Sequence, residues 1–351
     1  MSGSQGTDTL TVATEEPTPG RRNRRRQRKA TSGSTTDIQG KSPFQIAMGR
    51  LRRDKVAVVC AVIVVVLILL GVFAPLINNL WHISASPDGK YALKNTDVLE
   101  FDGLPAIGPP LYGFDWAHPL GLEPGTANDN LARLLLGIRT SLLVATLATV
   151  LSTVIGVVLG LMAGFSRGWL DRIISFVTDL FLSFPFILGA LALTPILVSR
   201  FGQDASSLGR ASFIALIVIL TVFGWMGLAR LVRGQVLSLR EREFVQAALV
   251  IGVPTRRILF KEMLPNLVAP IVIAISLGLP AYVTAEAGLS FLGIGLSGVP
   301  SLGQTVNLAR SYYEEYPLYL FAPVTTIAIL VLALNLLGDS IRDAFDPKTR
   351  R

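Results

Sequence analysis

Long apolar runs, separated by polar connections, dominate the chain from about residue 55 onward. The first run, 56–77, contains no charged residue and is long enough to cross the roughly 30 Å hydrocarbon core of a bilayer. Five further apolar runs of this kind occupy 141–163, 173–197, 211–229, 267–287 and 318–337. This pattern predicts an all-α polytopic membrane protein with six transmembrane helices.

The segments around these runs differ in character. Residues 1–41 are rich in Ser, Thr, Gly and Arg and can bury little, so we expect a disordered basic cytoplasmic tail there. In 42–55, apolar side chains recur at helical spacing between Phe44 and Leu51, which predicts an interfacial amphipathic segment. The other predicted segments are a first transmembrane helix 56–77, an extracytoplasmic loop 78–133, a five-helix core 134–345 containing a cytoplasmic loop 237–266, and a cytoplasmic tail 346–351.

The composition excludes several other classes of protein. Charged residues make up only 16% of the chain and apolar residues 51%, with a mean hydropathy of +0.54, whereas a soluble domain carries roughly a quarter charged residues. The single cysteine, Cys60, excludes an internal disulfide framework and a cysteine-based zinc site, and the two histidines argue against a His-rich metal centre. We therefore expect no catalytic, metal or cofactor site in this chain.

Basic residues are concentrated on alternate connections between the predicted spans. Segments 1–55 and 230–261 are rich in Lys and Arg, whereas 78–133 holds only Lys90, Lys94 and Arg133. Because Lys and Arg accumulate on the cytoplasmic side of membrane proteins, the sequence predicts that both termini and the loop 237–266 lie in the cytoplasm.

The loop 237–266, which we call the bracket, has the clearest local signals. Gly252 accepts a positive φ most easily, so we expect one helix to end near residue 251. A second helix, opened by Pro254, is expected to run to Pro265. Ala247 and Ala248 would offer a surface of small residues to another protein. The residues themselves leave two interpretations open, a docking element for a protein or a basic hairpin on anionic lipid.

The bracket also contains a recognisable signature: Glu-Ala-Ala, three residues, Gly, and a later Leu-Pro. Its positions are occupied by Gln246, Ala247, Ala248, Gly252, Leu264 and Pro265, with Gln in place of the usual Glu. Further motifs follow in a fixed order: His118-Pro-Leu-Gly121, Arg139-Thr-Ser-Leu142, Gly168-Trp-Leu-Asp171, Phe184-Pro185, Ala229-Arg-Leu-Val-Arg-Gly-Gln235, Leu289-Ser-Phe-Leu-Gly293 and Leu336-Leu-Gly-Asp339. On these motifs, over about residues 45–80 and 115–348, the chain resembles ATP-binding-cassette importer permeases, specifically the second permease subunit of the dipeptide/oligopeptide/nickel family.

The resemblance implies a type I importer permease-like core in which the bracket is the coupling element, with Phe244 and the signature residues in contact with an ATPase. It implies alternating access driven by separate ATPase subunits, so ATP and Mg are expected in those partners and this chain is not expected to be an enzyme. The implied partners are a second homologous permease, two cytoplasmic ATPases, an extracytoplasmic substrate-binding protein and the lipid of a bacterial plasma membrane, with no nucleic acid. The implied cargo is di- or oligopeptides, with nickel and oligosaccharides as alternatives.

The absence of a complete phosphate-binding loop also indicates a separate ATPase. One fragment imitates such a loop. Residues 35–42 end in Gly-Lys-Ser but lack the first glycine and a preceding strand. The fragment therefore cannot be expected to hold a nucleotide.

Two acids lie within apolar runs, where an ionised group is costly. Glu286, together with Tyr282, is a candidate for the translocation path or its outer gate, and equally for a structural acid. Asp179 is more simply explained as structural. The alternative function, a proton-coupled secondary transporter, would use Asp179 and Glu286 as its relay, and a membrane scaffold without transport is a third interpretation.

Segments 78–133 and 297–317 are expected to face outside and to receive the binding protein. Aromatic and acidic side chains near the end of the second segment would take part in that contact: Tyr312, Tyr313, Glu314, Glu315 and Tyr316.

Overall fold

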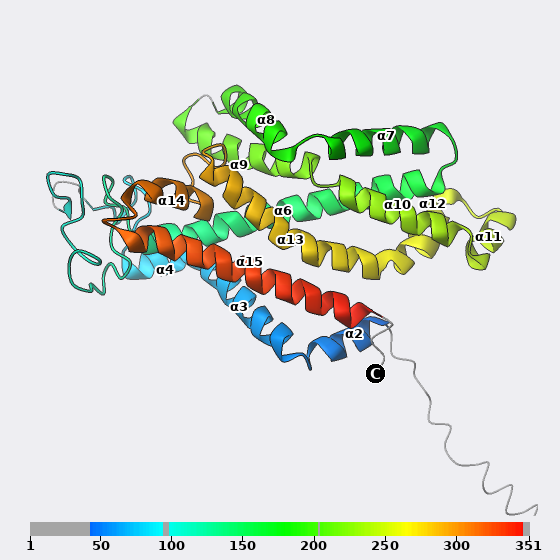
Figure 1. Cartoon of the computed structure of the whole chain (residues 1–351), viewed down its shortest axis with the longest axis horizontal. Coiled ribbons are helices and arrows are strands. Elements are labelled where there is room, and N and C mark those ends of the chain that lie inside the picture. The colour runs from blue at the N-terminus through cyan, green and yellow to red at the C-terminus, as the bar shows by residue number, and fades with distance from the viewer. Residues whose placement is uncertain (1–42, 94–97, 203, 347–351) are drawn as a thin grey trace, which may run out of the picture. The chain divides into compact units, whose positions relative to one another are not determined.

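A computed structural model describes residues 43–93, 98–202 and 204–346. The predicted tail 1–41 and most of the predicted tail 346–351 lie outside the described residues. Within them the chain is helical, and pairing of extended backbone is limited to the isolated bridges Leu99–Pro105 and Leu122–Asp129 (Figure 1). The predicted all-α class is confirmed.

The first predicted span is two helices. Asp54 caps α3 (Lys55–Val72) by accepting a hydrogen bond from the Val56 N–H at 2.9 Å. A break at Phe73 then precedes α4 (Ala74–Trp81), whose first turn contains a proline, the residue that suits a helix start. The predicted run 56–77 is therefore interrupted five residues before its expected end.

The segment before α3 forms the short helix α2 (Pro43–Leu51). Arg50 donates from Nη1 to the carbonyl oxygens of Ala344 and Asp346, at 3.3 and 3.2 Å. Ser340 donates to Asp54 Oδ2 at 2.8 Å. These contacts attach α2 to the end of α15 (Pro317–Phe345). The interfacial position of this segment stays a prediction.

The third predicted span, 173–197, is not one straight helix. It consists of α7 (Trp169–Ser183) and α8 (Phe186–Phe201), which are bent by 92° relative to each other. Pro185 cannot donate a backbone hydrogen bond, and Phe184 before it is extended, as a residue preceding proline usually is.

Aromatic packing fixes this bend. The Phe223 ring lies against the rings of Phe181, Phe184 and Phe186, with centroid distances of 5.7, 6.3 and 5.9 Å. Five helical segments of the described residues are long and apolar enough to span a membrane by themselves, and six if the bent pair counts as one span.

The remaining spans are longer than predicted. They are α6 (Asn130–Phe165), α9 (Ala205–Val222) followed by α10 (Met226–Arg240), α13 (Val268–Phe291) and α15. Helix α6 begins at Asn130, eleven residues before the predicted start of the second span at residue 141. Asp129 caps it, because its carboxylate accepts a hydrogen bond from the Ala132 N–H at 2.8 Å.

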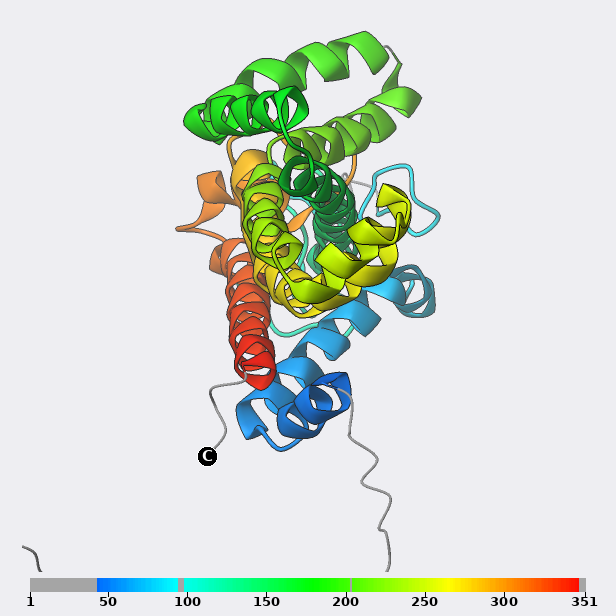
Figure 2. The same ribbon diagram turned by 90° about the vertical axis from the view of Figure 1, so that its right-hand side faces the viewer.

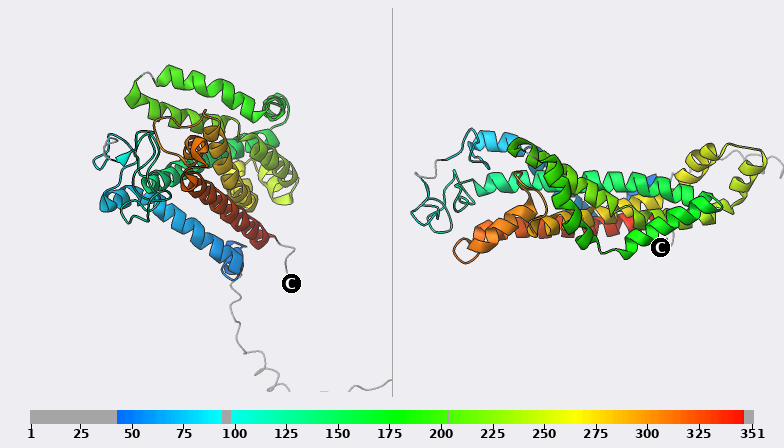
Figure 3. Two further views of the ribbon diagram at one scale, coloured as in Figure 1. Left: turned by 60° about the vertical axis from the view of Figure 1, so that its left-hand side comes forward. Right: turned by 90° about the horizontal axis from the view of Figure 1, so that it is seen from above.

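Helix α6 lies at the centre of the fold, where it packs against α10, α13, α9 and α3 (Figure 3). Gly156, Gly160 and Gly164 let α10 approach closely, because a Cβ at any of them would lie 2.7–2.8 Å from a backbone oxygen of the facing chain. The spacing of these glycines therefore marks close helix packing.

The two ends of this unit carry different elements. Helices α2, α11 (Glu243–Val250) and α12 (Thr255–Arg257) lie at the end that faces the viewer in Figure 2, where α15 also ends. The described residues 82–93 and 98–129, which we call the segment 82–129, and α14 (Leu302–Ala309) lie at the opposite end (Figure 1). The bracket and the segment 82–129 thus occupy opposite ends of the helices, as the predicted topology requires.

Candidate functional site

The turn of the bracket is built as its sequence predicts. Gly252 has a φ of +76° and directly follows the C-cap Ile251 of α11. The Val253 N–H donates to the carbonyl oxygen of Ala248 at 3.0 Å, and the Gly252 N–H donates to that of Leu249 at 3.1 Å. This pair of bonds is a Schellman motif, which requires the left-handed conformation that glycine adopts without strain.

The second helix of the bracket does not end at Pro265, so that expectation is wrong. After Pro254 the chain continues through α12, a π-helical turn Ile258–Met263 and a 3₁₀ turn Leu264–Leu267 directly into α13. Pro265 lies in the first turn of the 3₁₀ segment, where its missing N–H leaves no helical bond unmade. The bracket is therefore helically continuous with a spanning helix.

The inner side of α11 packs on the ends of the spanning helices. Val245 and Ala248 belong to a buried cluster with Val236 of α10, and Ile258 and Met263 of the following turns. Ala248 is 8% exposed, so it faces its own chain. The predicted small-residue surface of Ala247 and Ala248 is thus reduced to Ala247, which is exposed.

The outer side of α11 is apolar and open. Phe244 is 42%, Val250 86% and Ile251 77% exposed, and Ala247 lies between them at helical spacing. Of the other signature residues, Pro265 is exposed and Leu264 is half-buried. Sequence reasoning missed Val250 and Ile251, although their spacing from Phe244 and Ala247 places all four on one side of a helix.

Gln246 has a partner within the bracket. Its Nε2 donates to the carbonyl oxygen of Arg240, the last residue of α10, at 2.8 Å. The side-chain amide therefore closes the turn between α10 and α11, an interaction that needs a donor and that a glutamate carboxylate could not make.

Glu286 is sealed inside the fold. Its side chain is 0% exposed, and its Oε1 accepts a hydrogen bond from Ser290 at 2.8 Å. The hydroxyls of Ser141 on α6 and Ser301, the N-cap of α14, also lie against it. The carboxyl group thus joins α13 to α6 and α14 and faces no open path in this structure.

Tyr282, one turn before Glu286 on α13, does line a cavity.

Asp179 is paired and exposed. Its Oδ1 accepts a hydrogen bond from Arg230 Nη2 at 2.5 Å, and both side chains are at least 60% exposed. Nearby, Arg233 donates from Nε and Nη2 to the two carboxylate oxygens of Asp171, at 2.7 and 3.0 Å. The Asp171–Arg233 pair joins two motifs that lie far apart in the sequence, and both pairs attach α7 to α10.

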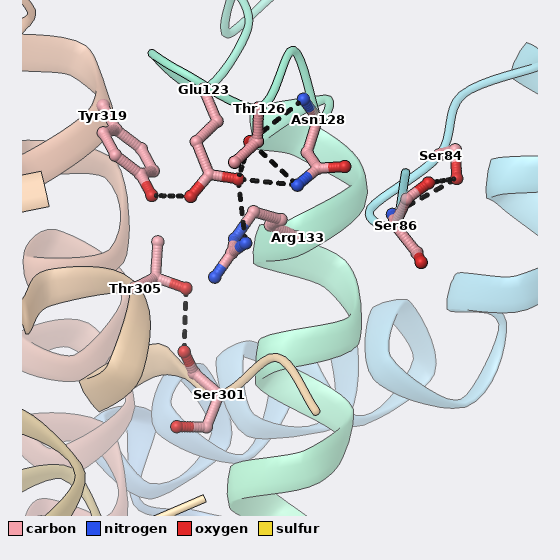
Figure 4. Close-up of polar contacts among 9 residues, drawn as sticks. All are labelled: Ser84, Ser86, Glu123, Thr126, Asn128, Arg133, Ser301, Thr305 and Tyr319. Carbon is pink, nitrogen blue, oxygen red and sulfur yellow. Dashed lines mark hydrogen bonds and ion pairs between the residues drawn. The ribbon is translucent and has the colours of Figure 1, made fainter. Parts of the chain in front are cut away.

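A buried carboxylate that the sequence did not single out organises the end opposite the bracket. Glu123 Oε2 accepts hydrogen bonds from Arg133 at 2.9 Å, Asn128 at 2.8 Å and Thr126 at 2.6 Å. Its other oxygen accepts one from the Tyr319 hydroxyl at 2.6 Å (Figure 4). Glu123 and Arg133 are 4% and 7% exposed. One carboxylate therefore ties the segment 82–129 to both α6 and α15.

Neighbouring groups extend this attachment. His118 Nδ1 lies 2.7 Å from Asp129 Oδ2, so the His118-Pro-Leu-Gly121 motif is held at the N-terminus of α6. Tyr316 is fully buried, which raises the pKa of its hydroxyl to about 12. It is therefore not part of an exposed contact surface, whereas Tyr313, Glu314 and Glu315 are exposed.

Two protein families and several known permeases match this chain. Residues 156–351 match the family described as binding-protein-dependent transport system inner membrane component, and residues 42–95 match the N-terminal transmembrane domain of oligopeptide transport permease C. A dipeptide transport system permease protein of Alkalihalophilus pseudofirmus is 33% identical over 88% of this chain and 91% of its own length.

One further relative by sequence and one solved structure are similar to the chain. An oligopeptide transport system permease protein of Bacillus subtilis is 31% identical over 92% of this chain and 96% of its own length. A chain of the inward-facing MetNI methionine ABC transporter is similar in structure, with 24% identity, a TM-score of 0.48, and coverage of 61% of this chain and 96% of that chain.

Proposed function

Because the chain belongs to the family of binding-protein-dependent transport system inner membrane components, we propose that it carries di- and oligopeptides across the membrane as a permease subunit of an ATP-driven importer. The observation that carries this function is the full-length similarity to dipeptide and oligopeptide permeases, at 31–33% identity. The resemblance predicted from the bracket signature is thereby confirmed. The family gives no support to the proton-coupled alternative, and Asp179 and Glu286 are each paired within the chain.

The bracket is the proposed contact with an ATPase. Its exposed apolar side, formed by Phe244, Ala247, Val250 and Ile251, projects beyond the helix ends where no part of the described chain covers it. The helical continuity from Pro254 into α13 would pass a movement of α11 directly to a spanning helix. ATP and Mg would be bound by the ATPase subunits, which would hydrolyse the ATP. The spanning helices of this chain would then move between inward-open and outward-open arrangements.

The complete importer would contain a second permease, two ATPases and an extracytoplasmic binding protein. The binding protein would meet the segment 82–129 and the exposed residues around Glu314, since these lie at the end opposite the bracket. The buried Glu123 network would keep that segment in a fixed position on α6 and α15.

Peptide uptake by cells tests the proposed function. Deletion of this chain should abolish uptake of a radiolabelled dipeptide at low external concentration, and the intact gene should restore it. Restoration should need an intact ATPase partner, because the proposal assigns ATP hydrolysis to that subunit. Unchanged uptake in the deletion strain, with the other peptide transporters removed, would contradict the proposal.

The proposed orientation places the segment 82–129 outside and the bracket in the cytoplasm. A cysteine at Asp88, in a Cys60→Ser background, should react with a membrane-impermeant maleimide on intact cells. A cysteine at Arg242 should react only after the membrane is permeabilised, since Lys and Arg around it favour the cytoplasmic side. Labelling of position 242 on intact cells would reverse the assignment.

A further inference from the structure

A cavity of about 230 Å³ with one polar wall opens between α6, α10 and α13, beside the break that separates α9 from α10. Its polar wall is made of hydroxyl groups: Thr149, Ser152 and Thr153 on α6, and Tyr282 on α13. A buried hydroxyl is costly unless it is hydrogen-bonded, and Thr149 and Ser152 meet this need with backbone carbonyls of the chain. What the wall offers to a bound molecule is the remaining lone-pair capacity of its four hydroxyl oxygens.

The hydroxyls of this wall keep acceptor capacity after their internal bonds are made. Thr149 donates to the carbonyl oxygen of Ala145 at 2.7 Å, and Ser152 donates weakly to that of Thr221 at 3.5 Å. A hydroxyl has two acceptor lone pairs besides its single donor. The wall thus presents oxygen acceptors, together with hydroxyls that can rotate to donate.

Glycines clear the space in front of these hydroxyls. A Cβ on Gly227 would meet nothing within 4 Å, and one on Gly278 would meet only the Tyr282 ring at 3.9 Å. Gly224 is different, because a Cβ there would collide with the Tyr282 hydroxyl. The absent side chains at Gly227 and Gly278 leave the cavity open, and Gly224 lets Tyr282 reach into it.

The chemistry of the wall selects for a class of ligand. None of the ten described residues that line the cavity is charged, and the nearby Glu286 is buried and bonded to Ser290. Neutral hydroxyls match the N–H and C=O groups of an amide, which every peptide shares whatever its side chains.

We propose that this cavity holds the backbone amide of a peptide during its passage through the membrane, with Thr149, Ser152, Thr153 and Tyr282 as its hydrogen-bonding wall. The inference rests on the proposed function and names the substrate contact within it. Binding through the amide also explains how one path can accept peptides of different side chains, since the contact is made to what they share.

The test is to fill the cavity without disturbing the helix. Gly227→Leu places a side chain into the cavity from an exposed position on α10, where the added Cβ has space. Gly234→Leu is the matched control, because Gly234 lies two turns later on the same helix, is equally exposed, has nothing within 4 Å of an added Cβ, and does not line the cavity.

Both variants are measured in the complete importer in proteoliposomes, as dipeptides imported per ATP hydrolysed. We expect Gly227→Leu to lower this ratio by about tenfold or more, while ATP hydrolysis stimulated by the binding protein is retained. Gly234→Leu should keep the wild-type ratio. Tyr282→Phe, which keeps the ring and removes only the hydroxyl, should lower the ratio by about fivefold, the effect of one lost hydrogen bond of about 1 kcal/mol.

Several outcomes would overturn the inference. An unchanged ratio in Gly227→Leu would show that the cavity is not on the path, and equal losses in both leucine variants would assign the effect to the surface of α10 as a whole. A Tyr282→Phe variant with the wild-type ratio would remove the hydroxyl from the contact. In each case ATP-dependent import by the wild type would still support the proposed function, and its absence there would contradict that function instead.

Discussion

Gly252→Val is expected to lower peptide uptake at least about tenfold while the protein still reaches the membrane. At a φ of +76° the Schellman turn of the bracket places a β-branched residue in the left-handed region, which costs on the order of 1–3 kcal/mol. The strain would be relieved by shifting α11, so its exposed side would no longer lie where the ATPase meets it. Uptake and stimulation of ATP hydrolysis by the binding protein should fall together.

Gly252→Asn is the matched control. A Cβ at this position meets nothing within 4 Å, so both substitutions have the same space, and asparagine adopts positive φ far more readily than valine. The asparagine variant should therefore keep most of the uptake. Equal uptake by the two variants would show that the turn does not position the coupling element.

Glu123→Leu should destabilise the end of the protein opposite the bracket by about 3–5 kcal/mol, because it leaves Arg133 buried without a counter-charge. The substitution also removes the acceptor of the Tyr319, Asn128 and Thr126 hydrogen bonds. The expected result is a lower unfolding temperature in detergent and faster proteolysis within the segment 82–129.

Two comparisons separate this effect from a general loss of charge. Glu100, an exposed carboxylate in the same segment that accepts a hydrogen bond from Tyr112, should tolerate Glu100→Gln with little change. The double variant Glu123→Leu/Arg133→Met should recover part of the lost stability, since it leaves no unpaired buried charge. A Glu123→Leu protein as stable as the wild type would contradict the role of this network.

Local signals in the sequence predicted the parts of the fold that depend on a few neighbouring residues. Gly252 and Pro254 determined the turn of the bracket because they act through the backbone at their own positions. The apolar runs predicted where helices cross the membrane, since length and hydropathy are sufficient for that. The ends of these helices were missed by up to eleven residues, as at α6, because its first turns contain Arg133 and Arg139 and so fall outside an uncharged apolar run.

Features that depend on distant partners could not be read from the sequence. The packing of the Phe184 ring against Phe223 brings together residues far apart in the chain, since Phe223 lies at the break between α9 and α10. Glu123 and Tyr319 are 196 residues apart, so the buried carboxylate looked like one more acid in a solvated loop. Ala248 is buried because it packs on Val236, Ile258 and Met263, which come from other turns and helices. The signature alone indicated only that small residues are needed at 247 and 248.

The most direct measurement of the central claim is peptide uptake by proteoliposomes that contain this chain, the second permease and the two ATPases. With the binding protein outside and ATP on the side of the ATPases, a labelled dipeptide should accumulate above its external concentration. Without ATP, an imposed proton gradient should produce no accumulation. Accumulation driven by the proton gradient alone, or ATP-dependent accumulation that persists when this chain is left out, would contradict the account.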